Sequence, residues 1–510
     1  MRSGKCLKLT GWLGRTQANL SRLAVRALSG PALPALFTGI YALAYAARFP
    51  LLRWQNVPST TFASITGYRP LAAITLAFAD LALVVLCWRL WRLSQTLPRR
   101  TVIPLIVAGW IGASACAILT FAGQSTDMGD YIFRAHMLVH LGRNPMTTPP
   151  SAVIAWKEFM YLSWHSEPDS YGPLWQWLSG AMHALVGENL LANFLAYKLL
   201  ATAAIGVSAW LIFAILARHT PGYAAAGLAL WLWNPLVLNE GTMHGHNDLA
   251  MIPLVLGAVA LLLHSLTRGV GHHSGSLGAV CTDVAGVLLL VAAGLIKATI
   301  WVLLPVAAVW LIRRRGLLKG MATVALGLLI GAALTWVAYR PFGGWDLLVF
   351  MVQKRGWWPA NSWPAALFFA LRNGAGWPHS ETVRWVIGGA AVIFTGVATV
   401  AMLRIRDLCL AAWAVVLAYL LIGCHWFQPW YVTWLIALAA LVPNRRVAGY
   451  TLICSFFMLL HPIAAQYWIS RLALPYGGSH AMIAAATLLV PQILAVYLVA
   501  TSQRRLRFFI

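Results

Sequence analysis

Residues 101–150 read TVIPLIVAGWIGASACAILTFAGQSTDMGDYIFRAHMLVHLGRNPMTTPP and combine the two features that define this chain. The stretch up to residue 122 carries no charge and is long enough to cross a hydrocarbon core of about 30 Å as a helix. The remainder turns polar and places Asp127 and Asp130 where the chain leaves the apolar run. We therefore expect a membrane-spanning helix followed by a surface segment with two carboxylates available for chemistry.

The composition extends this interpretation to the whole chain. Of the 510 residues, 60% are hydrophobic and only 10% are charged, which is too little charge to cover a soluble protein of this length. Apolar runs recur and are continuous rather than alternating, which favours helices over a β-barrel. The sequence therefore predicts an all-α polytopic membrane protein forming a single integral membrane domain over residues 1–510. Seven cysteines, an odd number, show no disulfide framework.

The distribution of charge predicts a topology. Starting with the N-terminus in the cytoplasm, most of the 37 lysines and arginines fall on the cytoplasmic side and most of the 13 acids on the other. This explains the net charge of +24 without a nucleic-acid partner. We expect a multi-pass protein of a bacterial-type plasma membrane with both termini cytoplasmic. About fourteen spans are predicted, near residues 33–47, 70–91, 101–122, 192–217, 222–238, 247–266, 279–295, 298–312, 319–338, 384–403, 408–423, 429–443, 447–465 and 480–500.

Two long loops are predicted on the outer face, at 123–190 and 339–383. In the first loop, apolar residues between Tyr131 and Leu141 have helical spacing, which predicts an amphipathic helix along the membrane interface. The second loop is rich in tryptophan, a residue that favours the boundary between membrane and water. Both loops are therefore expected to lie on the membrane surface and to carry interfacial helices.

Short polar motifs gather on this predicted outer face. They are DMGDY at 127–131, SYGPLW at 170–175, EGTMHGHND at 240–248, LIKAT at 295–299, the pair Lys354 and Arg355, and CHWFQPWY at 424–431. Outer loops are also polar simply because they contact water. The convergence of six such motifs nevertheless predicts a site cut into the outer end of the bundle.

The two acids of the first motif have different expected roles. A carboxylate at a membrane surface can act as a general base, and aspartate is also a common helix N-cap. Asp130 directly precedes the predicted helix and fits the cap, which leaves Asp127 as the freer base. Both are retained as catalytic candidates.

The remaining motifs offer cations and hydrogen-bonding groups. His246, Asn247 and Asp248 suit helix capping or sugar hydroxyls, and zinc binding by this motif lacks a third ligand. Lys297 is placed to bind a phosphate or to reach the lipid headgroups. Further phosphate-binding candidates are Arg340, Lys354 and Arg355. The candidates for binding sugar or acceptor are Tyr131, Tyr171, His246, Asn247, Asp248, His425, Gln428 and Trp430.

The order of these motifs carries a family resemblance. Asp-x-x-x-Tyr at 127–131, Gly-x-Asn-Pro at 142–145, Tyr-Gly-Pro at 171–173, His-Asn-Asp at 246–248, Lys297, and Gln-Pro-Trp-Tyr at 428–431 follow one another. Over roughly residues 100–445 the chain resembles bacterial GT-C glycosyltransferases that use polyprenyl-phosphate sugars, and in particular the polyprenyl-phosphate-mannose-dependent mannosyltransferases. The resemblance implies a GT-C-like bundle in which Asp127 is the base. That family places the loop after its first span, whereas here it follows the third.

The expected function is transfer of one hexose, expected to be mannose, from a polyprenyl-phosphate donor to a hydroxyl of a lipid- or glycan-linked acceptor, with inversion. A lipid phosphate is already a good leaving group, so one base and a few cations suffice, whereas a glycoside hydrolase needs paired carboxylates. The rivals are a transporter or flippase of lipid-linked sugars and a polysaccharide polymerase or ligase. No cofactor is expected, since the acids are too few and too dispersed to require a divalent metal ion.

Overall fold

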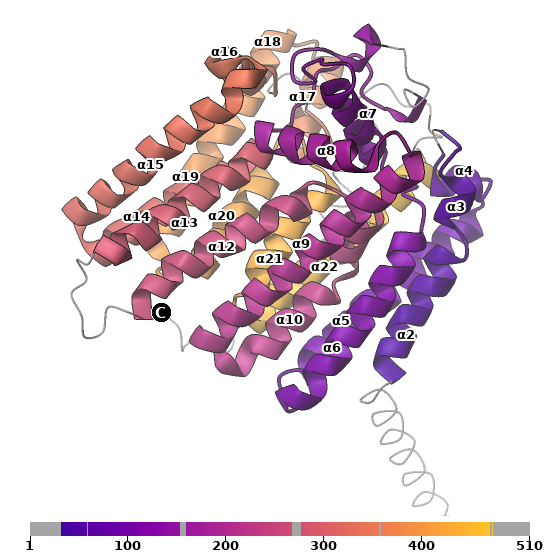
Figure 1. Cartoon of the computed structure of the whole chain (residues 1–510), viewed down its shortest axis with the longest axis horizontal. Coiled ribbons are helices and arrows are strands. Elements are labelled where there is room, and N and C mark those ends of the chain that lie inside the picture. The colour runs from indigo at the N-terminus through magenta and orange to yellow at the C-terminus, as the bar shows by residue number, and fades with distance from the viewer. Residues whose placement is uncertain are drawn as a thin grey trace, which may run out of the picture.

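The computed structural model describes residues 32–58, 60–153, 160–267, 277–355, 359–469 and 472, with the backbone alone at 265–267 and 352–355. Helices make up nearly all regular structure in these ranges, and the only β-pairings there are two isolated bridges, Pro50 with Thr120 and Ala360 with Trp426. The all-α prediction is confirmed. Figure 1 shows the long helices running roughly side by side as a tilted bundle.

Seven helical segments of the described residues are long and apolar enough to cross a membrane. They are α5 (Pro70–Leu93), α6 (Arg99–Leu119), α9 (Leu190–His219), α13 (Leu277–Ile296), α15 with η7 (Leu317–Phe342), α18 with η8 and α19 (His379–Arg404), and α22 (Arg445–Tyr467). The described residues also contain four shorter apolar segments. They are α2 with η1 (Ala32–Ala46), α12 (Asp248–Thr267), α20 with η9 (Leu408–Gly423), and η10 with α21 (Pro429–Ala440). The polytopic architecture is confirmed. The count of about fourteen stays a prediction, and its last run, 480–500, lies outside the described residues.

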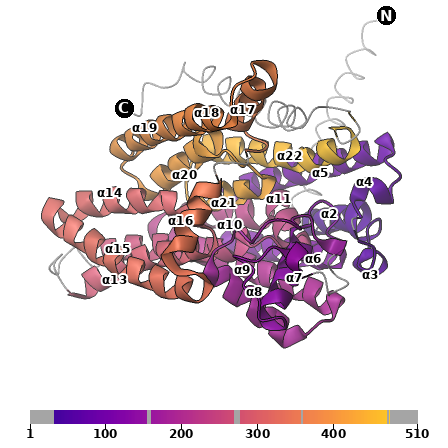
Figure 2. The same cartoon turned by 90° about the horizontal axis from the view of Figure 1, so that it is seen from above.

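The predicted run 222–238 is broken rather than continuous. It forms α10 (Ala224–Leu232), the short α11 (Pro235–Val237) and a π-turn, η5 (Leu238–Met243). Pro235 cannot donate a backbone hydrogen bond, so the chain restarts there with Asn234 accepting from the Leu236 amide at 3.0 Å. Every residue from 223 to 249 is buried, so this segment runs through the protein interior, and Figure 2 shows α10 and α11 among the other helices.

The elements with the polar motifs gather at one end of the bundle. Helix α7 (Asp127–Val139) packs against α8 (Pro173–Val186), and both lie across the upper end in Figure 1. At the same end lie α16 (Gly344–Arg355), α17 (Trp363–Gly374) and α18 (His379–Thr382), which form the second predicted loop. Of the helices not yet named, α3 (Leu51–Trp54) and α4 (Phe62–Ile65) are single turns, and α14 (Leu304–Arg315) ends in three arginines.

Helix α7 differs from its prediction in two respects. It begins at Asp127 rather than near Tyr131, and its N-cap is Thr126, whose side chain makes no capping hydrogen bond. The prediction that Asp130 caps this helix is therefore wrong. All residues from Met128 to Met137 are also buried, because α8 packs against the helix and the chain from Ser163 to Glu167 covers it at Asp130 and Arg134. The helix is enclosed by protein and does not present one face to lipid and the other to water.

Candidate active site

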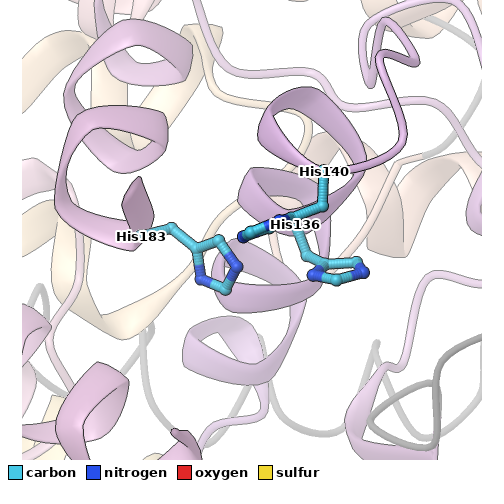
Figure 3. Close-up of side chains that lie close together, drawn as sticks. All are labelled: His136, His140 and His183. Atoms are coloured by element: carbon cyan, nitrogen blue, oxygen red, sulfur yellow. The ribbon is translucent and has the colours of Figure 1, made fainter. Parts of the chain in front are cut away.

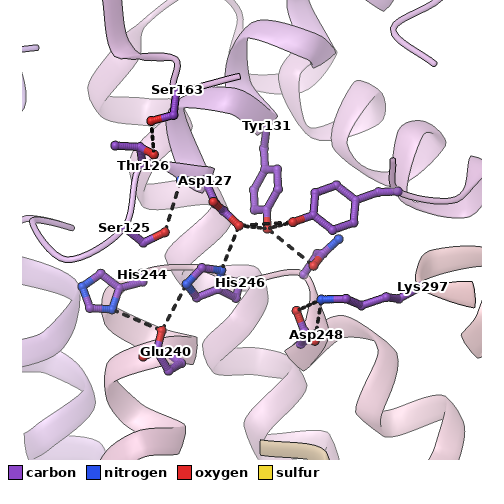
Figure 4. Close-up of polar contacts among 12 residues, drawn as sticks. Ser125, Thr126, Asp127, Tyr131, Ser163, Glu240, His244, His246, Asp248 and Lys297 are labelled. Atoms are coloured by element: carbon purple, nitrogen blue, oxygen red, sulfur yellow. Dashed lines mark hydrogen bonds and ion pairs between the residues drawn. The ribbon is translucent and has the colours of Figure 1, made fainter. Parts of the chain in front are cut away.

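Asp127 is the centre of a polar network at the start of α7 (Figure 4). Its Oδ2 atom accepts hydrogen bonds from the Tyr171 hydroxyl at 3.1 Å and the Tyr131 hydroxyl at 3.4 Å. The same oxygen lies 3.5 Å from Nδ1 of His246. Because all three contacts converge on Oδ2, Oδ1 is the oxygen that remains for another hydroxyl. The side chain is 13% exposed, so the carboxylate is largely sheltered but still reachable.

Tyr171 reaches Asp127 because its backbone docks tightly against the end of α13. The amide of Gly172 donates to the carbonyl of Ile296 at 3.0 Å. A Cβ atom at position 172 would lie 2.1 Å from the carbonyl oxygen of Leu295, so only glycine permits this approach. Asp169 then fixes the turn by accepting from the Tyr171 amide at 3.1 Å. The Tyr-Gly-Pro motif thus has a steric explanation.

His246 is fully buried and joins Asp127 to a second acid. Its Nε2 lies 3.1 Å from Oε2 of Glu240, opposite the Nδ1 contact to Asp127. Glu240 sits in the π-turn η5, whose wide turn carries the chain back toward α7. Gly245, with φ +65°, makes the tight turn that follows. The indole of Trp430 stacks on the imidazole at 3.9 Å and covers it.

Asp127 and His246 set each other's protonation. Burial acts to raise the pKa of Asp127, but the hydrogen bond and charge of His246, with help from Lys297 and Tyr171, hold that pKa below its ordinary value. Burial acts to lower the pKa of His246, yet Asp127 and Glu240 together raise it to about 9. At neutral pH the structure therefore holds an imidazolium beside the Asp127 carboxylate.

The raised pKa of His246 predicts how stability depends on pH. The unfolded imidazole has a pKa near 6.5, so the stability that the extra proton affinity contributes is complete below about pH 6.5. It is lost as the pH rises through about 9. We expect the Tm of the protein in detergent to fall between pH 7 and 9.5, and to fall less steeply in His246→Gln. Equal slopes for both proteins would contradict the buried imidazolium.

Lys297 is buried behind this network and is not exposed. Its Nζ contacts both carboxylate oxygens of Asp248, at 2.9 and 2.8 Å, and is 1% exposed. It also lies 4.1 Å from the ring centroid of Tyr431 and 5.5 Å from that of Trp434, while the Trp434 indole donates to Asp248 at 2.6 Å. In this arrangement the cation balances a buried carboxylate, and its phosphate-binding role stays a prediction.

Asp130 holds the loop that covers α7. Its carboxylate accepts from the backbone amides of Ser163 and Trp164 at 3.3 and 3.4 Å and lies 3.9 Å from the Arg134 guanidinium. Arg134 in turn donates to the carbonyls of Trp164 and Glu167. Burial, opposed by Arg134 and reinforced by Asp127, raises the pKa of Asp130 to about 7. These contacts give Asp130 a structural task distinct from that of Asp127.

A cavity of about 340 Å³ opens beside Asp127. Of the predicted site residues, the lining includes Asp127, Asp130, Tyr131, Tyr171, His425, Gln428 and Trp430. Much of the rest of the lining is aromatic or apolar, from Trp164 in the first loop, Phe350 and Met351 in α16, and Trp426 and Tyr431. A mostly apolar pocket with a few convergent polar groups is the usual form of a small-molecule site.

Other predicted residues lie outside this lining. His246, Asn247 and Asp248 are buried behind it, where Oδ1 of Asn247 lies 3.4 Å from the Tyr131 hydroxyl. Arg340 is exposed and its guanidinium lies 5.4 Å from the ring of Trp336. The side chains of Lys354 and Arg355 lie outside the described residues.

Glu240 is the residue that sequence reasoning missed. It belongs to the EGTMHGHND motif, but an acid six residues before a histidine indicates no contact in a regular helix. The π-turn and the turn at Gly245 bring the two side chains together. A helix-breaking Asn-Pro at 234–235 just upstream was the available signal of irregular backbone.

A comparison with known families shows which family this chain belongs to. The model of the alpha-(1->6)-mannopyranosyltransferase family, N-terminal domain, matches residues 35–313, more than half of the chain. The chain belongs to this family. The matched region contains α7, the Tyr-Gly-Pro segment, the π-turn with Glu240 and His246, and Lys297, so nearly the whole Asp127 network lies within it.

Individual relatives agree with the family. Over 190 residues the chain is 30% identical to alpha-(1->6)-mannopyranosyltransferase A of Corynebacterium glutamicum, covering 37% of this chain and 35% of the relative. Over 302 residues it is 25% identical to alpha-(1->6)-mannopyranosyltransferase A of Mycobacterium tuberculosis, covering 56% and 55%. The chain thus spans about half the length, or less, of the relatives it matches. No solved structure matches it.

Proposed function

We propose that this protein is a membrane mannosyltransferase that uses a polyprenyl-phosphate mannose donor and forms an alpha-(1->6) linkage on a lipid- or glycan-linked acceptor at the outer face of the membrane. The observation that carries the proposal is the sheltered Asp127 carboxylate, held ionised by His246 at the edge of a cavity of about 340 Å³. The family and the relatives' names support mannosyl transfer.

The reaction needs one bond made and one broken. The acceptor oxygen attacks the anomeric carbon of mannose from the face opposite the lipid phosphate. The bond between that carbon and the phosphate oxygen breaks, and the electron pair leaves with the phosphate, so the configuration inverts. The acceptor proton passes to Oδ1 of Asp127, the oxygen that the tyrosines and His246 leave accessible.

A carboxylate with a lowered pKa is adequate for this task. As the new bond forms, the acceptor oxygen gains positive charge and becomes far more acidic than a free alcohol, so a weak base can take its proton late in the step. An ionised carboxylate is also ready at neutral pH, and the buried imidazolium of His246 fixes its orientation. Tyr131 and Tyr171 share that orienting role.

Helix α16 offers the best placement for the donor phosphate. Phe350 and Met351 of this helix line the cavity, and Lys354 and Arg355 follow within one turn or so of the same helix. Exposed apolar side chains of α16, including Val349 and Phe350, offer a surface to a prenyl chain. We therefore assign Lys354 and Arg355 to the phosphate, ahead of the buried Lys297 and of Arg340, which does not line the cavity.

The test is a transfer assay with purified protein in detergent. A short-chain polyprenyl-phosphate mannose carrying radiolabelled sugar is incubated with an alpha-mannoside acceptor, and the linkage of the product is determined by NMR. We expect labelled alpha-(1->6) product from the lipid donor and none from a nucleotide-activated mannose. Product from the nucleotide donor alone, or movement of lipid-linked sugar across vesicles without any transfer, would overturn the proposal.

A further inference from the structure

Three histidines meet between α7 and α8, on the side of α7 away from the cavity lining. His136 lies in the last turn of α7 and His140, four residues later, is its C-cap, so they lie on the same helix face, and His183 projects from α8 toward them (Figure 3). One ring nitrogen from each lies within 4.8 Å of the other two. His136 and His183 are buried and His140 is exposed. None of the three belongs to the Asp127 network.

The position of the proton on His183 follows from its neighbour. The Nδ1 atom of His183 lies 2.8 Å from Oδ1 of Asn193. The amide nitrogen of Asn193 donates to the carbonyls of Gly187 and Asn189, at 2.7 and 2.9 Å, so the amide oxygen must face the histidine. The Nδ1 atom is therefore the donor, and the lone pair of the neutral ring is on Nε2. A hydrogen bond of this kind orients histidines that bind metals.

The surroundings of the other two rings also suit a metal ion. The Glu188 carboxylate lies 3.7 Å from Nδ1 of His136 and supplies an acidic oxygen at the edge of the cluster. The exposed ring of His140 gives access from solvent.

We propose that His136, His140 and His183 form a binding site for a divalent transition-metal ion of the Zn²⁺ class. Three imidazole nitrogens favour zinc and its neighbours over Mg²⁺ or Ca²⁺, which take oxygen ligands. A zinc–nitrogen bond of about 2.0–2.1 Å requires nitrogens roughly 3.4 Å apart in tetrahedral geometry. The three nitrogens lie within 4.8 Å of one another, so binding the ion requires small side-chain movements. The fourth position goes to water or to Glu188.

A metal ion at this site would hold two helices together. The ion joins α7, which begins with Asp127, to α8, which begins two residues after Tyr171. It therefore fixes the distance between the two helices that bring the carboxylate and its hydroxyl partner together. The ion takes no part in the transfer chemistry, since its two ligands at the end of α7 lie about two turns of helix or more from Asp127.

The experiment measures metal binding directly. Protein purified with an affinity tag that contains no histidine is stripped with a chelator and dialysed against micromolar Zn²⁺, and bound metal is counted by mass spectrometry. We expect one ion per chain, a rise in Tm on zinc addition, and a visible absorption spectrum of nitrogen-coordinated Co²⁺ when cobalt replaces zinc.

The variants make the test specific. His140→Ala changes an exposed side chain, so folding should be preserved, and it should weaken zinc binding at least tenfold, about 1.4 kcal/mol. His219→Ala, at the far end of α9, is the matched control and should bind zinc as the wild type does. Wild-type protein without stoichiometric zinc, or a His140→Ala variant that retains full affinity, overturns the site.

Discussion

Asp127→Asn is expected to reduce mannosyl transfer by about 10²–10⁴-fold, the usual cost of losing a general base. Asparagine is nearly isosteric and can still accept from Tyr131 and Tyr171, but it cannot take the acceptor proton. The variant also removes one of the two carboxylates that hold His246 protonated. Transfer from the lipid donor is measured under single-turnover conditions, and donor binding is measured separately and should be retained.

Asp130→Asn is the matched control for that experiment. It sits on the same turn of α7 and undergoes the same chemical change, but its partners are Arg134 and the amides of Ser163 and Trp164. We expect transfer to persist and stability to fall by about 1–3 kcal/mol, because one buried donor loses its acceptor. An inactive but folded Asp130 variant beside an active Asp127 variant would exchange the two roles.

Lys297→Met is expected to destabilise the protein by about 3–5 kcal/mol, the second largest effect that we expect. The substitution leaves the fully buried Asp248 carboxylate without its cation, and the Trp434 indole alone does not compensate that charge. The loss is measured as a fall in Tm in detergent and as a shift of the denaturation midpoint.

The double variant Lys297→Met with Asp248→Asn provides the internal check. Removing both charges removes the uncompensated ion, and an amide oxygen can still accept from the Trp434 indole, so much of the lost stability should return. A donor KM raised tenfold in Lys297→Met at unchanged stability would instead restore Lys297 as a phosphate ligand.

Much of the site was predictable because its residues lie in motifs with local meaning. The DMGDY, Tyr-Gly-Pro and Gln-Pro-Trp-Tyr motifs supplied seven of the residues that line the cavity, and the structure brings them together from distant parts of the chain. The sequence also predicted that these motifs lie on one face of the bundle. Each apolar run crosses the membrane once, so every second connecting loop lies on the same side. The role of each of these residues is still a prediction.

The sequence by itself determined the class of this protein, since continuous apolar runs of about twenty residues leave the backbone no alternative to helices in a membrane. It could not determine which buried charges pair. Lys297 and Asp248 are 49 positions apart, and Asp248 and Trp434 are 186 apart, so no periodicity in the sequence connects them. Three features were decided only by tertiary packing. The first is the π-turn that brings Glu240 to His246, and the second is the loop whose amides bind Asp130. The third is the contact of His183 with His136 and His140. A buried polar group must find a partner wherever the fold places one, and that place is a property of the whole bundle.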